Sequence, residues 1–213
     1  MDLESIDHVL TTTRAVRRRL DLSREVPREV IVDCIRISQQ APTGSDMQGW
    51  RWIVVTDPEV KAKLADIYRD GGSDYFADAA KLAAESGSAK VQRIYESAQF
   101  LSANLHNVPA LVVPCIKGRI EGQSNAWASG FYGSIFPAVW SFMLAARSRG
   151  LGSSLTTVHL FKEADAAELL GIPADVTQVG LVPLAYFTGD DFKPAARPPA
   201  EWITSWDRWG NKG

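Results

Sequence analysis

Apolar residues recur at helical spacing along much of the chain. In residues 27–41 they form one face, after a proline that suits a first helical position. Asp57 is a candidate N-cap for a second helix, which begins at Pro58. The further segments that we expect to be helical are residues 90–104, residues 131–149, closed by Gly150, and residues 161–170, closed by Gly171.

Short, continuous apolar runs predict buried strands over residues 52–55, 109–116 and 178–188. Residues 71–90 are rich in Gly, Ser and Ala and only weakly periodic, so we interpret them as a mobile excursion that contains one helix. Residues 117–129 are expected to form a loop. Strands and helices thus alternate irregularly, which favours α and β layers around one sheet.

Composition narrows the classes of protein. The chain has 213 residues, of which 46% are hydrophobic and 23% charged, enough for one domain with a real core. Its net charge of −2 argues against a nucleic-acid binder. The longest apolar stretch, residues 131–146, is interrupted by polar residues and proline, so we expect no membrane span. The polar start predicts no signal peptide, which favours the cytoplasm.

Several kinds of site are unsupported by the sequence. Cys34 and Cys115 form no CxxC motif, and the three histidines have no metal-ligand spacing, so no metal site is predicted. A GxSxG elbow and a Walker A lysine loop are both missing, so the main sequence signals of a hydrolase and of an NTPase are not present.

Arginine is concentrated near the N-terminus. Of 23 basic residues 15 are arginine, and Arg14, Arg17, Arg18 and Arg19 fall within six positions. Guanidinium groups bind phosphate bidentately, so the cluster is a candidate phosphate site. The alternative is a solvated basic turn paired with nearby acids. The three threonines at 11–13 are candidates to cap a helix start and to add hydroxyl donors to an anion.

Two further segments suit ligand recognition. The sequence APTGSDMQGW, residues 41–50, predicts a tight turn with exposed backbone donors followed by polar and aromatic groups, which suits a planar polar ring edge. Its alternative is an ordinary helix-to-strand connection. The sequence RGLGSSLTT, residues 149–157, follows a helix rather than a strand and lacks the third glycine of a dinucleotide fingerprint. It remains a candidate for bringing backbone N–H groups to a ligand.

The tail is rich in proline and tryptophan. Trp202, Trp206 and Trp209 stand at i, i+4 and i+7 spacing, which is typical of a helix. Such a segment is either a terminal helix docked on its own core or an arm docked on a second subunit. We favour the arm.

Taken in order, these segments resemble the FMN-dependent nitroreductase family. The matching motifs are RAVRR, APTGSDMQGWRWIVVTD, GLGSS after a long apolar helix, ELLGIP and FKPAARPP, and they span residues 8–200. The resemblance implies an α+β fold, a three-layer α/β/α sandwich with a mixed central sheet. It also implies a homodimer in which residues 1–189 form the FMN-binding domain and residues 190–213 an arm on the partner subunit.

The resemblance also implies the site. Arg14 should bind the FMN phosphate, beside Ala15, which replaces an arginine of the family, and either Arg17 or Arg18 should join it. Arg19 is expected to be only a surface charge. The loop against the flavin ring, expected from the partner subunit, comprises Pro42, Thr43, Gly44, Asp46 and Gln48. The remaining cofactor-binding positions are Leu155, Thr156 and Thr157, whose backbone should line the ring near N5, and Arg197 on the phosphate.

The function implied is transfer of two electrons from NAD(P)H through flavin N5 to a nitro group, a quinone or another small electrophile. The cofactor carries this chemistry, so no side chain is assigned as acid or base. Asp46 stands where the family has asparagine, and Gly49 where it has proline, which weakens any inference about substrate. The alternatives are a flavin-sequestering protein without turnover, and a relative that dehalogenates or fragments its ligand.

Overall fold

The computed structural model describes residues 2–213. The chain forms two compact units, one of residues 14–189 and one that joins residues 2–13 to residues 190–213. Across the described residues, no helix is long and apolar enough to cross a membrane.

The larger unit is built on one sheet. Its strands are ordered β1 (Trp50–Val55), β2 (Ala110–Lys117), β5 (Val182–Tyr186) and β3 (Leu151–Ser153), and β4 (Val176–Gln178) also pairs with β2. All of these pairings are antiparallel. The prediction of a mixed sheet is therefore wrong for the five strands. Among the described residues, the one parallel pairing is an isolated bridge between Ala15 and Ser153.

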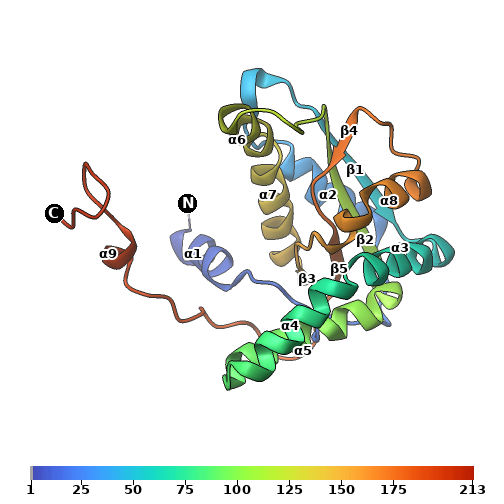
Figure 1. Cartoon of the computed structure of the whole chain (residues 1–213), viewed down its shortest axis with the longest axis horizontal. Helices are drawn as coiled ribbons and strands as arrows, with labels where there is room; N and C mark the ends of the chain where they lie inside the picture. The colour runs from blue at the N-terminus through green and yellow to red at the C-terminus, as the bar shows by residue number, and fades with distance from the viewer. Residues whose placement is uncertain (1) are drawn as a thin grey trace. The chain divides into compact units, whose positions relative to one another are not determined.

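Helices cover both faces of this sheet (Figure 1). On one face lie α2 (Arg28–Ser38) and α7 (Phe136–Arg147), and the other carries α3 (Pro58–Gly71), the 3-10 helix η3 (Val158–Lys162) and α8 (Glu163–Leu170). The rings of Trp52 and Phe142 meet at 5.3 Å in the core beneath α7. The predicted three layers are confirmed.

Two predicted elements are divided in the structure. The helix expected over residues 131–149 is α6 (Asn125–Gly133) followed by α7, because Pro137 occupies a first-turn position and starts a new helix. The expected loop over 117–129 is consequently too long, since α6 begins within it. The strand expected over 178–188 is the end of β4 plus β5, with a break around Gly180.

Predictions that depend on a few neighbouring residues agree better with the structure. Asp57 caps α3, since its carboxylate accepts the N–H groups of Glu59 and Val60 at 2.9 and 3.0 Å. Gly171 follows α8 in the left-handed conformation, with φ of 65°. Residues 71–90 contain one helix, α4 (Ser73–Glu85), which pairs with α5 (Ala89–Asn104). A 3-10 turn, η2 (Leu105–Asn107), follows.

The smaller unit contains α1 (Leu3–Thr12) and α9 (Ala200–Ile203), and His8 Nε2 lies 2.7 Å from Asp191 Oδ2. The three threonines close α1 instead of opening a helix, and their hydroxyls donate to carbonyls four residues earlier. The prediction of one helix through the three tryptophans is also wrong, because α9 ends at residue 203. Trp202, Trp206 and Trp209 are exposed.

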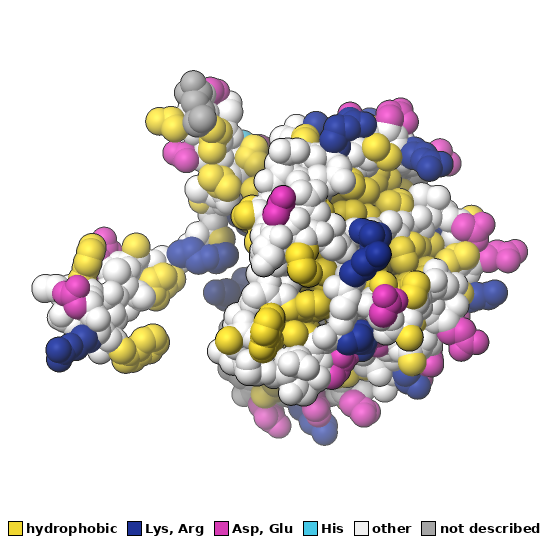
Figure 2. Space-filling view, turned by 90° about the horizontal axis from the view of Figure 1, so that it is seen from above, with side chains coloured by type: hydrophobic (Ala, Val, Ile, Leu, Met, Phe, Trp, Pro, Cys, Tyr) yellow, Lys and Arg dark blue, Asp and Glu magenta, His cyan; other side chains and the backbone are white. Residues whose placement is uncertain are grey.

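Hydrophobic side chains also reach the surface of the molecule between charged ones (Figure 2). Three of the most exposed in the larger unit are Met47, Trp127 and Phe161. Met47 follows the 3-10 turn η1 (Gly44–Asp46), in the loop that is predicted to contact a ligand.

Candidate functional site

The arginine segment packs against the strand that ends in the Gly-Ser turn. Val16 donates its N–H to the Ser153 carbonyl at 2.8 Å, next to the parallel bridge of Ala15. A Cβ on Gly152 would lie 2.9 Å from Val16 Cγ1, so this approach requires glycine. The fold therefore brings together two segments that are more than 130 positions apart in sequence, as the ligand hypothesis requires.

The arginines of this segment have different surroundings. Arg19 donates from Nε to the Thr188 carbonyl at 2.6 Å, which gives it a local structural role. Arg18 pairs with Glu96 of α5 at 3.2 Å. Within the described residues the side chain of Arg17 makes no hydrogen bond or ion pair, and it is only half-buried. Arg17 therefore keeps its guanidinium available for a ligand, and which of the two binds the phosphate stays a prediction.

Residues 154–157 follow the Gly-Ser turn directly. Thr156 exchanges two backbone hydrogen bonds with Leu181, at 2.9 and 2.8 Å, and its hydroxyl lies 3.0 Å from that of Tyr68. Its polar groups are thus engaged. In the described part of the chain, no hydrogen bond engages the N–H groups of Leu155 and Thr157. The available donors therefore flank Thr156.

The loop at residues 42–48 is a strained turn. Ser45, Asp46 and Gln48 have φ of 53°, 52° and 46°, a conformation that is costly for residues with a side chain. Gly44 donates its N–H to Ser134 Oγ at 2.9 Å, and Gln48 Nε2 donates to Asp46 Oδ1 at 3.0 Å. Strain that persists in this way is found preferentially at functional sites.

This loop and the arginine segment lie at opposite ends of α7 (Figure 1). The loop is fastened to Ser134, just before the helix, whereas β3 begins just after it. A helix of 12 residues is about 18 Å long at 1.5 Å per residue. One chain therefore does not join Pro42, Thr43 and their neighbours to the arginines.

Arg197 belongs to the smaller unit, where its guanidinium donates to the Ala196 carbonyl at 3.2 Å. Its assignment to the phosphate stays a prediction.

The residues around β3 fit a phosphorylated flavin in their chemistry. Guanidinium groups at Arg14 and Arg17 suit a phosphate, and the backbone donors of Leu155 and Thr157 suit polar atoms of a ring. Gly152 allows the two segments that carry these groups to approach closely. Across residues 2–213, no group of three His, Cys, Asp or Glu side chains is arranged to hold a metal ion.

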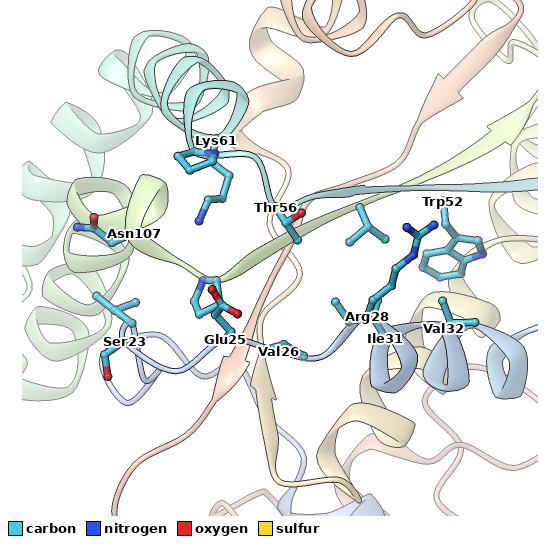
Figure 3. A pocket seen from close by; sticks show the side chains of 14 residues that line it. Ser23, Glu25, Val26, Arg28, Ile31, Val32, Trp52, Thr56, Lys61 and Asn107 are labelled. Atoms are coloured by element: carbon cyan, nitrogen blue, oxygen red, sulfur yellow. The ribbon is translucent and has the colours of Figure 1, made fainter.

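A groove of about 890 Å³ lies elsewhere, along the edge of β1 that no described strand covers (Figure 3). Glu25 and Arg28 line it before and within α2, and Lys61 reaches it from α3. Lys61 Nζ donates to the Val108 carbonyl at 2.9 Å, and burial lowers the pKa of its ammonium. Apolar residues, including Val26 and Trp52, form much of the rest of the wall.

The model of the nitroreductase family matches residues 10–186 of this chain. The chain belongs to the nitroreductase family. The family predicted from the sequence is therefore confirmed, and family membership places the protein among the oxidoreductases.

Individual relatives are distant. A putative NADH dehydrogenase/NAD(P)H nitroreductase of Methanothermobacter thermautotrophicus is 24% identical over 83% of this chain and 74% of its own length. The structure resembles a BluB-like flavoprotein from Clostridium difficile 630, with a TM-score of 0.71, 18% identity and coverage of 98% and 100% of the two chains. It also resembles oxidized iodotyrosine deiodinase bound to FMN and 3-iodo-L-tyrosine, with a TM-score of 0.67, 18% identity and coverage of 95% and 97%.

The names of these relatives describe different reactions, and likeness at this level of identity shows the fold alone. The electron acceptor therefore stays a matter for proposal and experiment. Tyr68 is the residue there that sequence reasoning missed. Its only signal was an apolar position on the predicted helix, and nothing in the sequence connects it to Thr156, 88 positions later.

Proposed function

We propose that this nitroreductase-family protein is an FMN-dependent oxidoreductase. In this proposal NAD(P)H supplies two electrons, which pass through flavin N5 to a small electrophilic acceptor such as a nitro compound or a quinone. The observation that carries it is the packing of the arginine segment on β3, which gathers cationic side chains and available backbone donors at one sheet edge.

Each part of this edge has a distinct task in the proposal. Arg14 and Arg17 bind the phosphate, because charge-assisted guanidinium contacts are strong and directional. The N–H groups of Leu155 and Thr157 donate to polar atoms of the ring and favour its electron-rich reduced form. Bound FMN supplies the hydride-accepting centre. Protons come from water, so no side chain acts as an acid or base.

The ring-facing loop is proposed to come from a second subunit. Residues 42–48 are too far from the arginines of their own chain, yet they are held in a strained and exposed turn. A homodimer would bring the loop of one protomer to the arginine segment of its partner. We propose that residues 190–213, with their exposed tryptophans, act as an arm on the partner.

Flavin titration and rapid mixing test the function. Purified protein is expected to bind FMN and quench its fluorescence, and anaerobic mixing with NADH or NADPH should bleach the flavin absorbance. Protein that takes up no FMN would contradict the proposal. Binding without bleaching by either nucleotide would instead indicate a flavin-sequestering protein.

Mixed dimers test the two-subunit site. One chain carries Arg14→Ala, and the other carries Asp46→Gly and Gln48→Gly, which remove two side chains without adding strain at positive φ. If the site combines two subunits, an isolated mixed dimer has one intact site and binds one FMN at wild-type affinity. If each chain builds its own site, both sites are impaired and no such binding returns.

A second candidate function is reductive removal of a halide from an aromatic substrate. It is favoured by the likeness to iodotyrosine deiodinase, whose structure covers nearly the whole chain. It uses the same two electrons with a different acceptor. Product analysis after anaerobic turnover with a halotyrosine and, separately, a nitroarene distinguishes the two, since only the first releases halide.

A further inference from the structure

Tyr68 lies in the last turns of α3 with only 3% of its surface exposed. Its hydroxyl is 3.0 Å from Thr156 Oγ1. Phenylalanine would fill the same space with its ring against Phe76, at a centroid distance of 6.2 Å. The buried hydroxyl therefore has to be explained by its bond to Thr156 rather than by packing.

Thr156 is fastened on its other side as well. Its N–H donates to the Leu181 carbonyl at 2.9 Å, and its carbonyl accepts the Leu181 N–H at 2.8 Å. A Cβ on Gly180 would fall 2.5 Å from Leu155 Cδ1, so the neighbouring residue is fitted closely against the chain before β5. The backbone bonds hold Thr156 to Leu181, and the Tyr68 hydroxyl holds it to α3.

The same tyrosine is within electrostatic reach of the arginine segment. Burial raises the pKa of Tyr68, whereas the Thr156 hydroxyl and the positive charge of Arg17 act in the opposite direction. The positive charge of Arg17 is thus near enough to act on the Tyr68 hydroxyl, which itself contacts Thr156.

We propose that Tyr68 is a positioning residue for the flavin. Its hydroxyl holds Thr156, and through Thr156 it fixes the place of the N–H groups of Leu155 and Thr157. This inference rests on the proposed function, in which those groups donate to bound FMN. The role differs from a contact with the cofactor, because the hydroxyl is already engaged inside the protein.

Three variants test this role in the full-length protein. Tyr68→Phe removes the hydroxyl and keeps the ring, and Thr156→Val removes the other partner of the same bond. Thr156→Ser keeps the hydroxyl and is the rescue variant. Tyr186→Phe is the matched control, since its ring lies under Arg24 and its hydroxyl makes no hydrogen bond within the described residues.

The measurements are the FMN dissociation constant by fluorescence quenching, the midpoint potential of the bound flavin, and the Tm of the apoprotein. Tyr68→Phe and Thr156→Val should each raise the dissociation constant about threefold to tenfold, the range expected for one hydrogen bond. Each should also make the potential more negative, because the donors that favour the reduced ring are less well held. The double variant should be no worse than either single one, and Thr156→Ser and Tyr186→Phe should match wild type.

The outcomes separate this role from the proposed function. Wild-type protein that binds no FMN contradicts the function itself. Wild-type binding together with an unchanged dissociation constant and potential in Tyr68→Phe contradicts the positioning role alone, even if Tm falls. Fully additive effects in the double variant also contradict it, because they would mean that the two hydroxyls act separately.

Discussion

The two loops that carry ligand-recognition signals are built in opposite ways. Residues 14–20 are bonded to β3 and to the end of β5, where Asp21 and Thr188 continue the backbone hydrogen bonds. Residues 42–48 hold a left-handed backbone at three non-glycine positions and depend on Ser134 for anchorage. Backbone hydrogen bonds to the sheet hold the first region, whereas the second is held by a hydrogen bond to the Ser134 side chain.

This difference indicates what each region contributes. A segment fixed by backbone bonds can present charges to a ligand without further ordering, which reduces the cost of binding. A strained, exposed loop at the far end of α7 is separated from the arginine segment of its own chain by the length of that helix. The contrast is what a site shared between two protomers requires, and the following predictions test it.

The largest effect is expected from acid, which acts on a buried histidine of the larger unit. His159 is fully buried on η3, and burial lowers its pKa to about 4, with Glu163 and Gln178 opposing. Folding thus favours the neutral ring, so its contribution to stability is present above pH 6.5 and is lost as the pH falls toward 4. The loss approaches about 3 kcal/mol at 1.36 kcal/mol per pKa unit. Denaturant unfolding at several pH values measures it.

His159→Leu should flatten this part of the pH dependence, because leucine does not titrate. The exposed His106 provides the matched control, His106→Gln, which should keep the wild-type slope. An equal slope in wild type and His159→Leu would show that other groups cause the acid sensitivity.

Arg14→Ala should weaken FMN binding about tenfold to a hundredfold, since a charge-assisted hydrogen bond contributes about 1.5–3 kcal/mol. Fluorescence titration measures the change. Arg36→Ala is the control, because Arg36 is exposed on α2 and its ion pair is with the neighbouring Asp33. An unchanged dissociation constant in Arg14→Ala would show that Arg14 does not bind the phosphate.

Arg17 and Arg18 should differ. Arg17→Ala is expected to raise the FMN dissociation constant about tenfold, by the same reasoning as for Arg14. Arg18→Ala should change it about twofold or less, since it removes only an exposed ion pair with Glu96. Titration of both variants at one ionic strength makes the comparison, and a reversed order would assign the phosphate to Arg18.

The smallest effect is expected in the second region. Asp46→Asn removes a negative charge and keeps an oxygen that can accept the hydrogen bond from Gln48. Asparagine also tolerates the positive φ of this position. FMN affinity and Tm should stay near wild type, while the midpoint potential becomes more positive because a carboxylate no longer opposes an electron-rich ring. Spectroelectrochemical titration measures the potential. An unchanged potential would place Asp46 away from the flavin.

Much of the fold could be predicted because its signals are local. The Asp57 cap, the left-handed Gly171 and the apolar runs of β1 and β2 each depend on a few neighbouring residues. Predictions failed where distant contacts decide the outcome. The expected tryptophan helix stops after one turn because spacing alone does not supply a surface to bury its apolar face.

The amino-acid sequence by itself determined the family, the segments that carry candidate chemistry and the concentration of arginine near the N-terminus. Only the tertiary structure paired Arg18 with Glu96, brought Ala15 to Ser153 and joined Tyr68 to Thr156. The reason is physical. The residue type and its spacing limit what a side chain can bind. Whether that side chain is available to a ligand depends on the partners that it already contacts in the folded chain.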